Sequence, residues 1–183
     1  MSTVCIVGVD PHPNGGHFVV SEWIIAEGED PQLVFAAQAE PWTEPGATYV
    51  VEDPRGVLFN RTSSLLWSQT NFSAGEIRER FDAEMVSPAE ARKSLVKMAG
   101  ATGVPTKDGH IKELLELIFG VDAFSKGKVC SRRKAKSHGP DCPKCHGTTW
   151  ESPPGKLHEI SNPHFRDAFV VAQYVAMRMA GGE

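Results

Sequence analysis

The chain has 183 residues, of which 40% are apolar and 23% are charged, and its formal net charge is −4. This apolar content suffices for one domain of ordinary size with a small appendage, and it argues against an intrinsically disordered chain. No apolar run approaches the roughly 20 residues of a membrane-spanning helix, and the first residues lack the charged and apolar zones of a signal peptide. We therefore expect a cytoplasmic protein that has no membrane partner.

The first 53 residues predict a three-stranded meander followed by a further strand. A short apolar run, TVCIVGVD, ends in Asp10, and the residues after it, PHPNGG, form a turn sequence. HFVVSEWII and QLVFAAQ predict the second and third antiparallel strands. TYVVED, residues 48–53, is another apolar strand, which ends in acidic residues and is stopped by Pro54.

The middle of the chain predicts helices around one short strand. Residues 61–81 have a helical pattern, AEMV predicts a short strand, and Ser87-Pro88 begins a helix that continues through Lys97. In KDGHIKELLELIFG the apolar residues recur at helical spacing, and the last glycine is placed to end the helix. Residues 121 to about 160 predict irregular structure.

The stretch SNPHFRDAFVVAQYVAMR, Ser161 to Arg178, predicts a helix that is apolar on several sides and therefore lies against the sheet. Asn162 suits the N-cap and Pro163 the first helical position. His164 and Asp167 stand three residues apart, on one face of the helix. Capping does not account for Asp167, and a carboxylate at the rim of a buried helix needs a partner, either a base or a metal ion.

This order of elements predicts an α/β fold, a mixed five-stranded sheet covered by helices. Asp10 and Glu52 both end apolar strands, so their side chains share one edge of the sheet if the two strands are adjacent and parallel. A helix across that edge would add His164 and Asp167. Three converging carboxylates repel one another, so a cation must hold them together, and oxygen ligands with one imidazole suit Mg²⁺ or Mn²⁺.

Two such ions about 4 Å apart can activate water on one side of a phosphodiester and stabilise the leaving oxygen on the other. Taken singly, each acid also has an ordinary interpretation. Asp10 before a proline is a common turn opening, Glu52 is a solvated carboxylate at a strand end, and Asp53 is a rival for the role of Glu52.

One segment differs in charge from the rest of the chain. KGKVCSRRKAK, residues 126–136, holds six of the 19 basic residues and no acidic one, which leaves a balance of −10 elsewhere. Such a run is either a solvated tether or a site that attracts phosphate. The candidate DNA-binding side chains in it are Lys126, Lys128, Arg132, Arg133, Lys134 and Lys136.

Three of the four cysteines cluster with a histidine at a spacing of C-x7-H-x3-C-x2-C. Cys142 and Cys145 form a knuckle whose two thiolates can bind one tetrahedral zinc ion, and Cys130 and His138 complete the ligand set. His146 is the alternative fourth ligand. We expect a structural zinc ion here, because a cytoplasmic location disfavours disulfides; the alternative is a loop of unrelated cysteines.

The segments IVGVDP, YVVEDP, SPAEARKSLVKMAGATGVPTKDGHIKELLELIFG and HFRDAFVVA resemble, in this order, the motifs of the RuvC family of Holliday junction resolvases, within the RNase H-like superfamily. That family has a strand ending in an acid before proline and a second strand ending in glutamate. A proline-led helix then runs into a Gly- and Lys-containing stretch and another helix, and the final helix opens with His-x-x-Asp or Asp-x-x-Asp. The four motifs span most of residues 4–178.

This resemblance implies an RNase H-like sheet in which Asp10, Glu52 and Asp167 bind two Mg²⁺ or Mn²⁺ ions. His164 is then a ligand or positions the attacking water. Lys107, in the lysine-bearing stretch, is expected to contact phosphate. The implied activity is a homodimeric endonuclease that nicks branched DNA, above all four-way junctions, and leaves 5′-phosphate ends, since a two-fold enzyme suits a two-fold junction.

The chain departs from the family pattern at two places. Only ten residues, AEPWTEPGAT, separate the third strand from YVVED, where the family has a full helix. The second departure is the insertion before the last helix. We therefore divide the chain into a nuclease core of residues 1–120, a basic zinc-binding insertion of residues 121–160, and a helix in residues 161–183 that completes the core.

Two other functions fit the same residues. One is an RNase H-like nuclease that acts on other DNA or on RNA–DNA hybrids. The other is a non-catalytic, zinc-stabilised nucleic-acid-binding protein in which the acidic residues only cap and pair. The presence of all three acids, Asp10, Glu52 and Asp167, speaks against the non-catalytic alternative.

Overall fold

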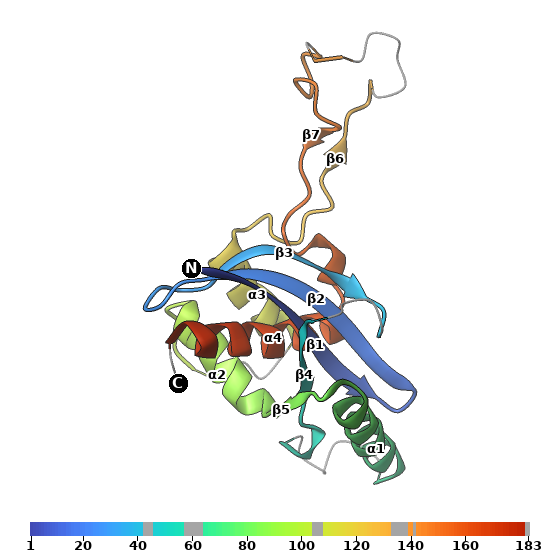
Figure 1. The fold of residues 1–183 in the computed structure, drawn as a ribbon. Helices are drawn as coiled ribbons and strands as arrows, with labels where there is room; N and C mark the ends of the chain where they lie inside the picture. The colour runs from blue at the N-terminus through green and yellow to red at the C-terminus, as the bar shows by residue number, and fades with distance from the viewer. Residues whose placement is uncertain (42–45, 57–63, 104–107, 133–138, 141, 182–183) are drawn as a thin grey trace.

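A computed structural model describes the chain apart from residues 42–45, 57–63, 104–107, 133–138, 141 and 182–183. A five-stranded sheet in the order β3-β2-β1-β4-β5 lies at its centre (Figure 1). The strands are β1 (Ser2–His12), β2 (Gly15–Ile25), β3 (Gln32–Ala39), β4 (Thr48–Glu52) and β5 (Glu84–Val86). The helices are α1 (Ser64–Phe81), α2 (Pro88–Met98), α3 (Asp108–Phe119) and α4 (Pro163–Gly181).

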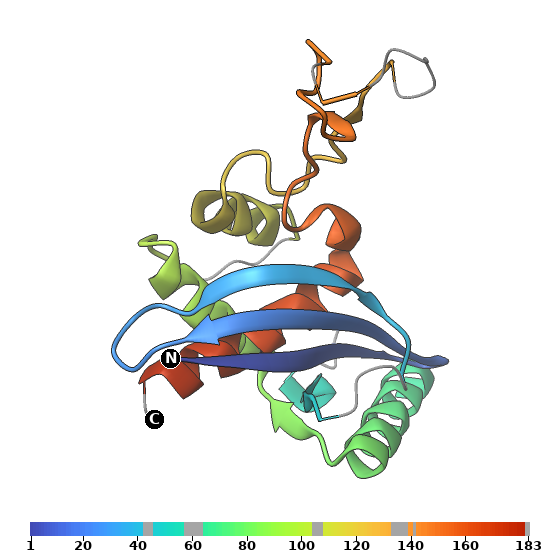
Figure 2. The same cartoon turned by 45° about the horizontal axis from the view of Figure 1, so that its top comes forward.

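The sheet is mixed, as the sequence predicts. β1, β2 and β3 form the antiparallel meander, whose long strands lie side by side in Figure 2. β4 pairs in parallel with β1, and β5 pairs in parallel with β4. The predicted α/β class, a mixed five-stranded sheet flanked by helices, is therefore confirmed. The strand that follows β3 in the chain, β4, thus lies beside β1.

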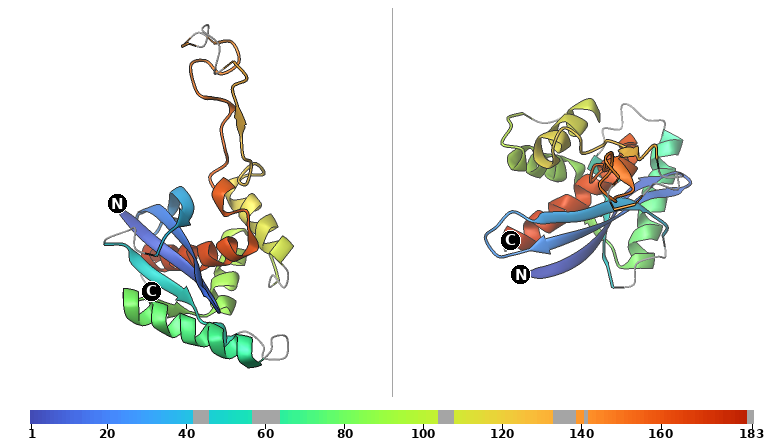
Figure 3. Two further views of the ribbon diagram at one scale, coloured as in Figure 1. Left: turned by 90° about the vertical axis from the view of Figure 1, so that its right-hand side faces the viewer. Right: turned by 90° about the horizontal axis from the view of Figure 1, so that it is seen from above.

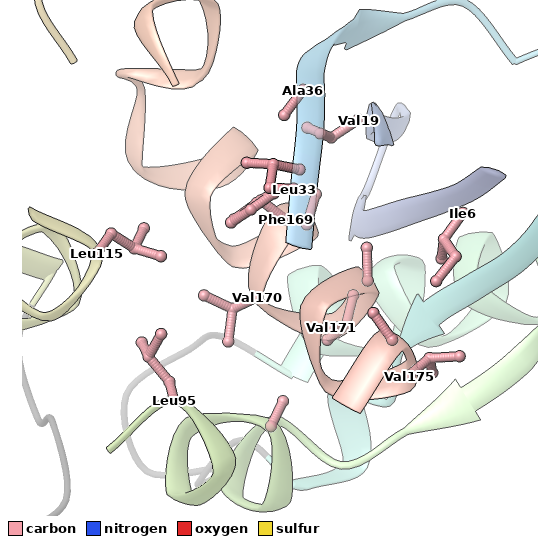
Figure 4. Close-up of a cluster of buried hydrophobic side chains, with 14 of the residues drawn as sticks. Ile6, Val19, Leu33, Ala36, Leu95, Leu115, Phe169, Val170, Val171 and Val175 are labelled. Carbon is pink, nitrogen blue, oxygen red and sulfur yellow. The ribbon is translucent and has the colours of Figure 1, made fainter. Parts of the chain in front are cut away.

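Alternation along the strands divides the core between the two faces of the sheet. On one face the apolar side chains pack against α4 and, beyond it, against α2 and α3 (Figure 4). On the other face they pack against α1. On the first face, the strand residues Ile6, Val19, Trp23 and Val50 meet Phe169, Val171 and Val175 of α4. On the second face, the strand residues Val7, Val9, Phe18 and Val51 meet Ala74 and Ile77 of α1.

The described residues of the segment 126–154, called the arm from here on, extend away from the core (Figures 1 and 3). The sequence predicts irregular structure here, but the arm contains a two-stranded antiparallel ribbon, β6 (Lys128–Val129) and β7 (Trp150–Ser152). The ribbon forms because the two sides of the arm run next to each other, as the 2.9 Å hydrogen bond from the Cys130 N–H to the Thr149 carbonyl shows.

The base of the arm is fixed to the core. The Gly155 N–H donates to the Ser125 carbonyl at 2.8 Å, and the Leu157 N–H donates to the Ala123 carbonyl at 2.8 Å. A Cβ atom on Gly155 would lie 2.0 Å from the Asp122 carbonyl oxygen, so only glycine permits this crossing. Ala123 and Leu157 belong to the buried core, although both lie inside residues 121–160. The domain division at residues 121 and 160 stays a prediction.

None of the helices in the described part of the chain is both long enough and apolar enough to cross a membrane.

Candidate active site

The ends of two parallel strands bring the first two acidic residues together. Val9 of β1 is level with Val51 of β4, so Asp10 and Glu52 follow side by side at the same edge of the sheet. Because side chains alternate along a strand, both carboxylates share the face that α4 covers. The hypothesis that these strands are adjacent and parallel is therefore confirmed.

A glycine in β1 allows α4 to approach this edge. Gly8 is buried on the same face as Asp10, and a Cβ atom built on it would lie 1.9 Å from the Ala168 carbonyl oxygen of α4. Any side chain there must push the helix away, because backbone atoms cannot give way as the end of a flexible side chain can. Gly8 therefore sets the close contact that places the first turns of α4 over Asp10.

The start of α4 supplies the two remaining groups. The Asn162 side chain caps the helix, since its Oδ1 accepts the His164 N–H at 3.0 Å. His164 Nδ1 lies 2.8 Å from Asp10 Oδ2. Asp167 Oδ1 lies 3.4 Å from an Arg92 Nη2 of α2. The structure thus brings Asp10, His164 and Asp167 to one place, and it adds Arg92, which the sequence analysis did not identify.

Burial and mutual repulsion perturb the carboxylates. Burial is the main cause that raises the pKa of Glu52 to about 8, and the negative charges of Asp10 and Asp167 add to it. Burial also raises the pKa of Asp10 to about 6, although the hydrogen bond with His164 opposes that shift. Arg92 lowers both values. Three carboxylates therefore gather at one partly buried edge, and a bound cation would stabilise their charged forms.

His17 is a further member of this site that the sequence analysis missed. It is the third residue of β2, directly opposite Asp10 of β1, and it shares a sheet face with Val19, which packs toward α4. Its ring is stacked on that of His164, with centroids 4.7 Å apart and an angle of 9° between the planes. The edge of the Phe165 ring also meets it, at 5.1 Å between centroids. Burial is the main cause that lowers the pKa of His17.

Among the described residues of this edge, metal-ligand atoms of Asp10, His17 and His164 all lie within 4.8 Å of one another. Glu52 and Asp167 are not part of this group, but they are coupled to Asp10 electrostatically. Carboxylate oxygens with imidazole nitrogens fit a divalent cation, so the residues present suit the metal that the sequence predicts.

Asp53, the rival of Glu52, is engaged elsewhere. Its carboxylate accepts hydrogen bonds from the Arg55 guanidinium, and the shorter one measures 2.8 Å. This bond is the main cause that lowers the pKa of Asp53. The Asp167 carboxylate acts on Asp10, and the Asp10 and Asp167 carboxylates act on Glu52; Asp53 is not among these groups. The geometry therefore favours Glu52 over Asp53 at this site.

The predicted zinc ligands lie at the far part of the arm. The thiols of Cys130, Cys142 and Cys145 are buried and lie within 4.8 Å of one another, and the first two sulfur atoms are 3.8 Å apart. Burial raises the pKa of the Cys145 thiol to about 11, whereas a hydrogen bond from the Lys144 backbone lowers that of Cys142. His138 lies outside the described residues, and the exposed His146 does not belong to the group.

The predicted DNA-binding residues are only partly described. Lys107, Arg133, Lys134 and Lys136 lie outside the described residues. Lys126, Lys128 and Arg132 are exposed on the arm. Lys128 forms an ion pair of 2.7 Å with Glu151.

No protein-family model matches this chain, and no curated protein sequence matches it. Two solved structures are similar in the course of the chain. One, a Thermus thermophilus RuvC structure, has a TM-score of 0.45 and 11% identity, and the match covers 96% of this chain and 95% of that one. The other is T. thermophilus RuvC in complex with Holliday junction substrate, with a TM-score of 0.44, 11% identity, and coverage of 96% and 94%. At this identity neither structure assigns a role to a residue of this chain.

Proposed function

We propose that the chain is a divalent-metal-dependent endonuclease that hydrolyses phosphodiester bonds in branched DNA, with four-way junctions as its main substrate. The observation that carries this proposal is the meeting of Asp10, Glu52, His164 and Asp167 at one sheet edge. These residues come from motifs that resemble those of the RuvC family in their order along the chain. The raised pKa values of Asp10 and Glu52 support it, because burial and the neighbouring carboxylates disfavour their charged forms and a bound cation would offset that cost.

The bound Mg²⁺ or Mn²⁺ ions, two in this proposal, supply charge stabilisation for the reacting phosphate and activate the attacking water. Asp10, Glu52 and Asp167 would hold the cations. The His164 imidazole lies against Asp10 through Nδ1, where it would bind a cation or position the attacking water. Arg92 balances part of the negative charge when phosphate is absent, and its guanidinium is close enough to the carboxylates to contact a phosphate that enters between them.

The arm provides DNA contacts away from the reacting bond. Its basic residues can bind phosphates, and a zinc ion held by Cys130, His138, Cys142 and Cys145 would keep those residues in place at a lower entropic cost than a free tail. This zinc is structural, because four protein ligands leave no open position for water. A homodimer would present two such arms and two sites to a four-way junction.

One assay tests the proposal directly. A labelled four-way junction, a flap, a linear duplex and an RNA–DNA hybrid are incubated with the protein and Mg²⁺, Mn²⁺ or chelator. We expect metal-dependent nicks in the junction before the other substrates, and at least roughly 100-fold slower cleavage by Asp10→Asn and Glu52→Gln.

Asp53→Asn is the matched control, since it removes a neighbouring acid that binds Arg55. It should cleave at the wild-type rate. An inactive Asp53→Asn beside a fully active Glu52→Gln contradicts the assignment on β4, and preferred cleavage of the hybrid selects the RNase H-like alternative. A protein that binds the junction but never cuts it is the non-catalytic alternative.

A further inference from the structure

His17 lies beside Asp10 and His164, and one nitrogen of its imidazole is buried without a hydrogen-bond partner among the described residues. The ladder between β1 and β2 fixes it opposite Asp10. Among the described residues, nothing hydrogen-bonds to its buried Nδ1 atom. Leaving a buried polar atom without a partner costs free energy, so such an atom in a charged site requires a reason.

We propose that His17 is a metal ligand, and that Asp10, His17 and His164 together hold one ion through a carboxylate and two imidazoles. This inference rests on the proposed metal-dependent function and extends it, because the RuvC-like motifs supply only one of these two histidines. The second ion is then left to the carboxylate side of the site, where Glu52 and Asp167 lie.

The geometry is close to that of a closed site. The three ligand atoms lie within 4.8 Å of one another. Two atoms bound to one ion at roughly 2.1 Å are at most about 4.2 Å apart, and only when they lie on opposite sides of the ion, so closure requires His17 to move by up to about 1 Å. The rings of His17 and His164 are stacked nearly parallel, so one ring must also turn about its side-chain torsions before both lone pairs point to the ion. Asp10 Oδ2 already lies 2.8 Å from His164 Nδ1, a separation that two ligands of one ion can share.

Two imidazoles change which metal the site prefers. Mg²⁺ favours oxygen ligands and holds its water strongly, whereas imidazole nitrogen suits transition metals. A site of one carboxylate and two histidines therefore selects Mn²⁺ or Co²⁺ over Mg²⁺. The chemical class of this cofactor is a divalent transition-metal ion.

His12 provides an internal comparison. It lies at the end of β1, and its ring meets those of His17 and His164 edge-on, at 5.8 and 6.1 Å between centroids. Its side chain is exposed, and it is not part of the tight ligand group. His12 therefore serves as a control for His17, because it packs at the same edge without belonging to the ligand group.

The test is Mn²⁺ binding without DNA, followed by electron spin echo spectroscopy that counts the imidazole nitrogens coupled to the ion. We expect two coupled nitrogens in the wild type and in His12→Ala. His17→Phe keeps an aromatic ring against His164 and Phe165 but offers no lone pair, so we expect one. Its Kd for Mn²⁺ should rise roughly tenfold or more while that for Mg²⁺ changes less, because imidazole contributes mainly to transition-metal binding. His17→Gln is a second variant in case the phenylalanine disturbs folding.

The outcomes separate this inference from the function on which it rests. If Asp10→Asn abolishes Mn²⁺ binding but the wild type shows only one coupled nitrogen, the role of His17 is overturned and the metal site remains. If Asp10→Asn and wild type bind Mn²⁺ equally, the proposed site itself is wrong. An unchanged nitrogen count in both His17 variants also overturns the assignment.

Discussion

The sheet edge and the arm each gather metal-ligand side chains, but they do so in opposite ways. At the sheet edge, Asp10 and His164 are 154 residues apart in sequence, and the core of the protein brings them together. On the arm, Cys130, Cys142 and Cys145 come from one short segment, and the buried cluster there consists of these three residues. The fold of the core brings the residues of the sheet edge together, whereas the three cysteines themselves form most of the packing in their part of the arm.

This difference predicts different consequences of removing the metal. The sheet edge is held by apolar packing on both faces, so the protein keeps its charged ligands together even when they repel one another. Among the described residues of the arm, the buried cluster consists of the three cysteines alone, and binding of zinc would supply folding free energy there. We therefore expect that removal of all metal ions leaves the core folded and disorders only the arm.

The largest expected effect comes from breaking the scaffold of the sheet edge. Gly8→Ala places a methyl group against the Ala168 carbonyl and must displace α4. We expect cleavage to fall roughly 100-fold, because a misplacement of about 1 Å is enough for such a loss, and zinc content to stay unchanged. Single-turnover cleavage and metal analysis measure the two effects.

Gly75→Ala in α1 is the control for this change, because a Cβ atom there meets nothing within 4 Å. It should leave cleavage unchanged and raise stability slightly, as alanine does in a helix. Wild-type cleavage by Gly8→Ala would show that α4 does not need this close contact.

The pH dependence of stability sharpens the comparison. The folded-state pKa values of Asp10 and Glu52, about 6 and about 8, lie above their ordinary values. Their contribution is therefore fully present below about pH 4 and is lost as the pH rises through 6 and 8. Without Mg²⁺ or Mn²⁺ the core should lose stability over this range, and Glu52→Gln should remove on the order of 2 kcal/mol of that loss.

Urea denaturation between pH 5 and 9, on zinc-loaded protein with and without Mn²⁺, measures this dependence. The arm should behave in the opposite sense, since its thiols must lose protons to bind zinc and its zinc affinity therefore increases with pH. A core whose stability rises from pH 5 to 8 without metal would contradict the assigned carboxylate burial.

A smaller effect is expected when the arm is broken. Cys142→Ser should abolish zinc binding and weaken junction binding roughly tenfold, about the value of a few phosphate contacts. Cleavage at saturating DNA and the unfolding temperature of the core should change little, because the three cysteines of the arm lie outside both core clusters. Cys5→Ser, in β1, is the control and should keep one zinc per chain. A chain that unfolds completely with Cys142→Ser contradicts the independence of the arm.

The smallest effect concerns a carboxylate on the arm. Glu151 binds Lys128 and accepts hydrogen bonds from Ser131, and these bonds lower its pKa to about 2. Glu151→Gln should release Lys128 and raise junction affinity about two- to threefold at low salt, with a steeper salt dependence. Glu113→Gln on α3 removes the same charge elsewhere and should have no effect. If junction affinity depends on salt concentration equally in both variants, Lys128 does not contact DNA.

The sequence predicted the parts of the fold that local patterns determine. Two apolar strands that end in acidic residues, together with a proline-led helix and an apolar last helix, predicted the mixed sheet. They also predicted that Asp10 and Glu52 meet. His17 was missed although a signal existed. A two-residue turn between His12 and Gly15 fixes the register, which places His17 opposite Asp10, and alternation then assigns its face.

Other features had no local signal. Arg92 pairs with Asp167 across 75 residues of sequence, and no spacing rule links the two. A glycine within a strand indicates a close approach of other backbone, but only the fold shows that α4 is what approaches Gly8. The ribbon of the arm depends on contacts between its two sides, which periodicity does not report.

The long separation between Asp10 and His164 also determines the order in which the molecule can assemble. The meander of β1, β2 and β3 consists of local contacts and can form early, whereas α4 must close a loop of most of the chain before it docks. Until then the face of the sheet that α4 covers is exposed, and folding intermediates at this stage are prone to aggregate. The arm precedes α4 in the chain and can close on itself before that helix docks. Under the proposed function, a nascent molecule would acquire its nucleic-acid contacts before it completes its active site.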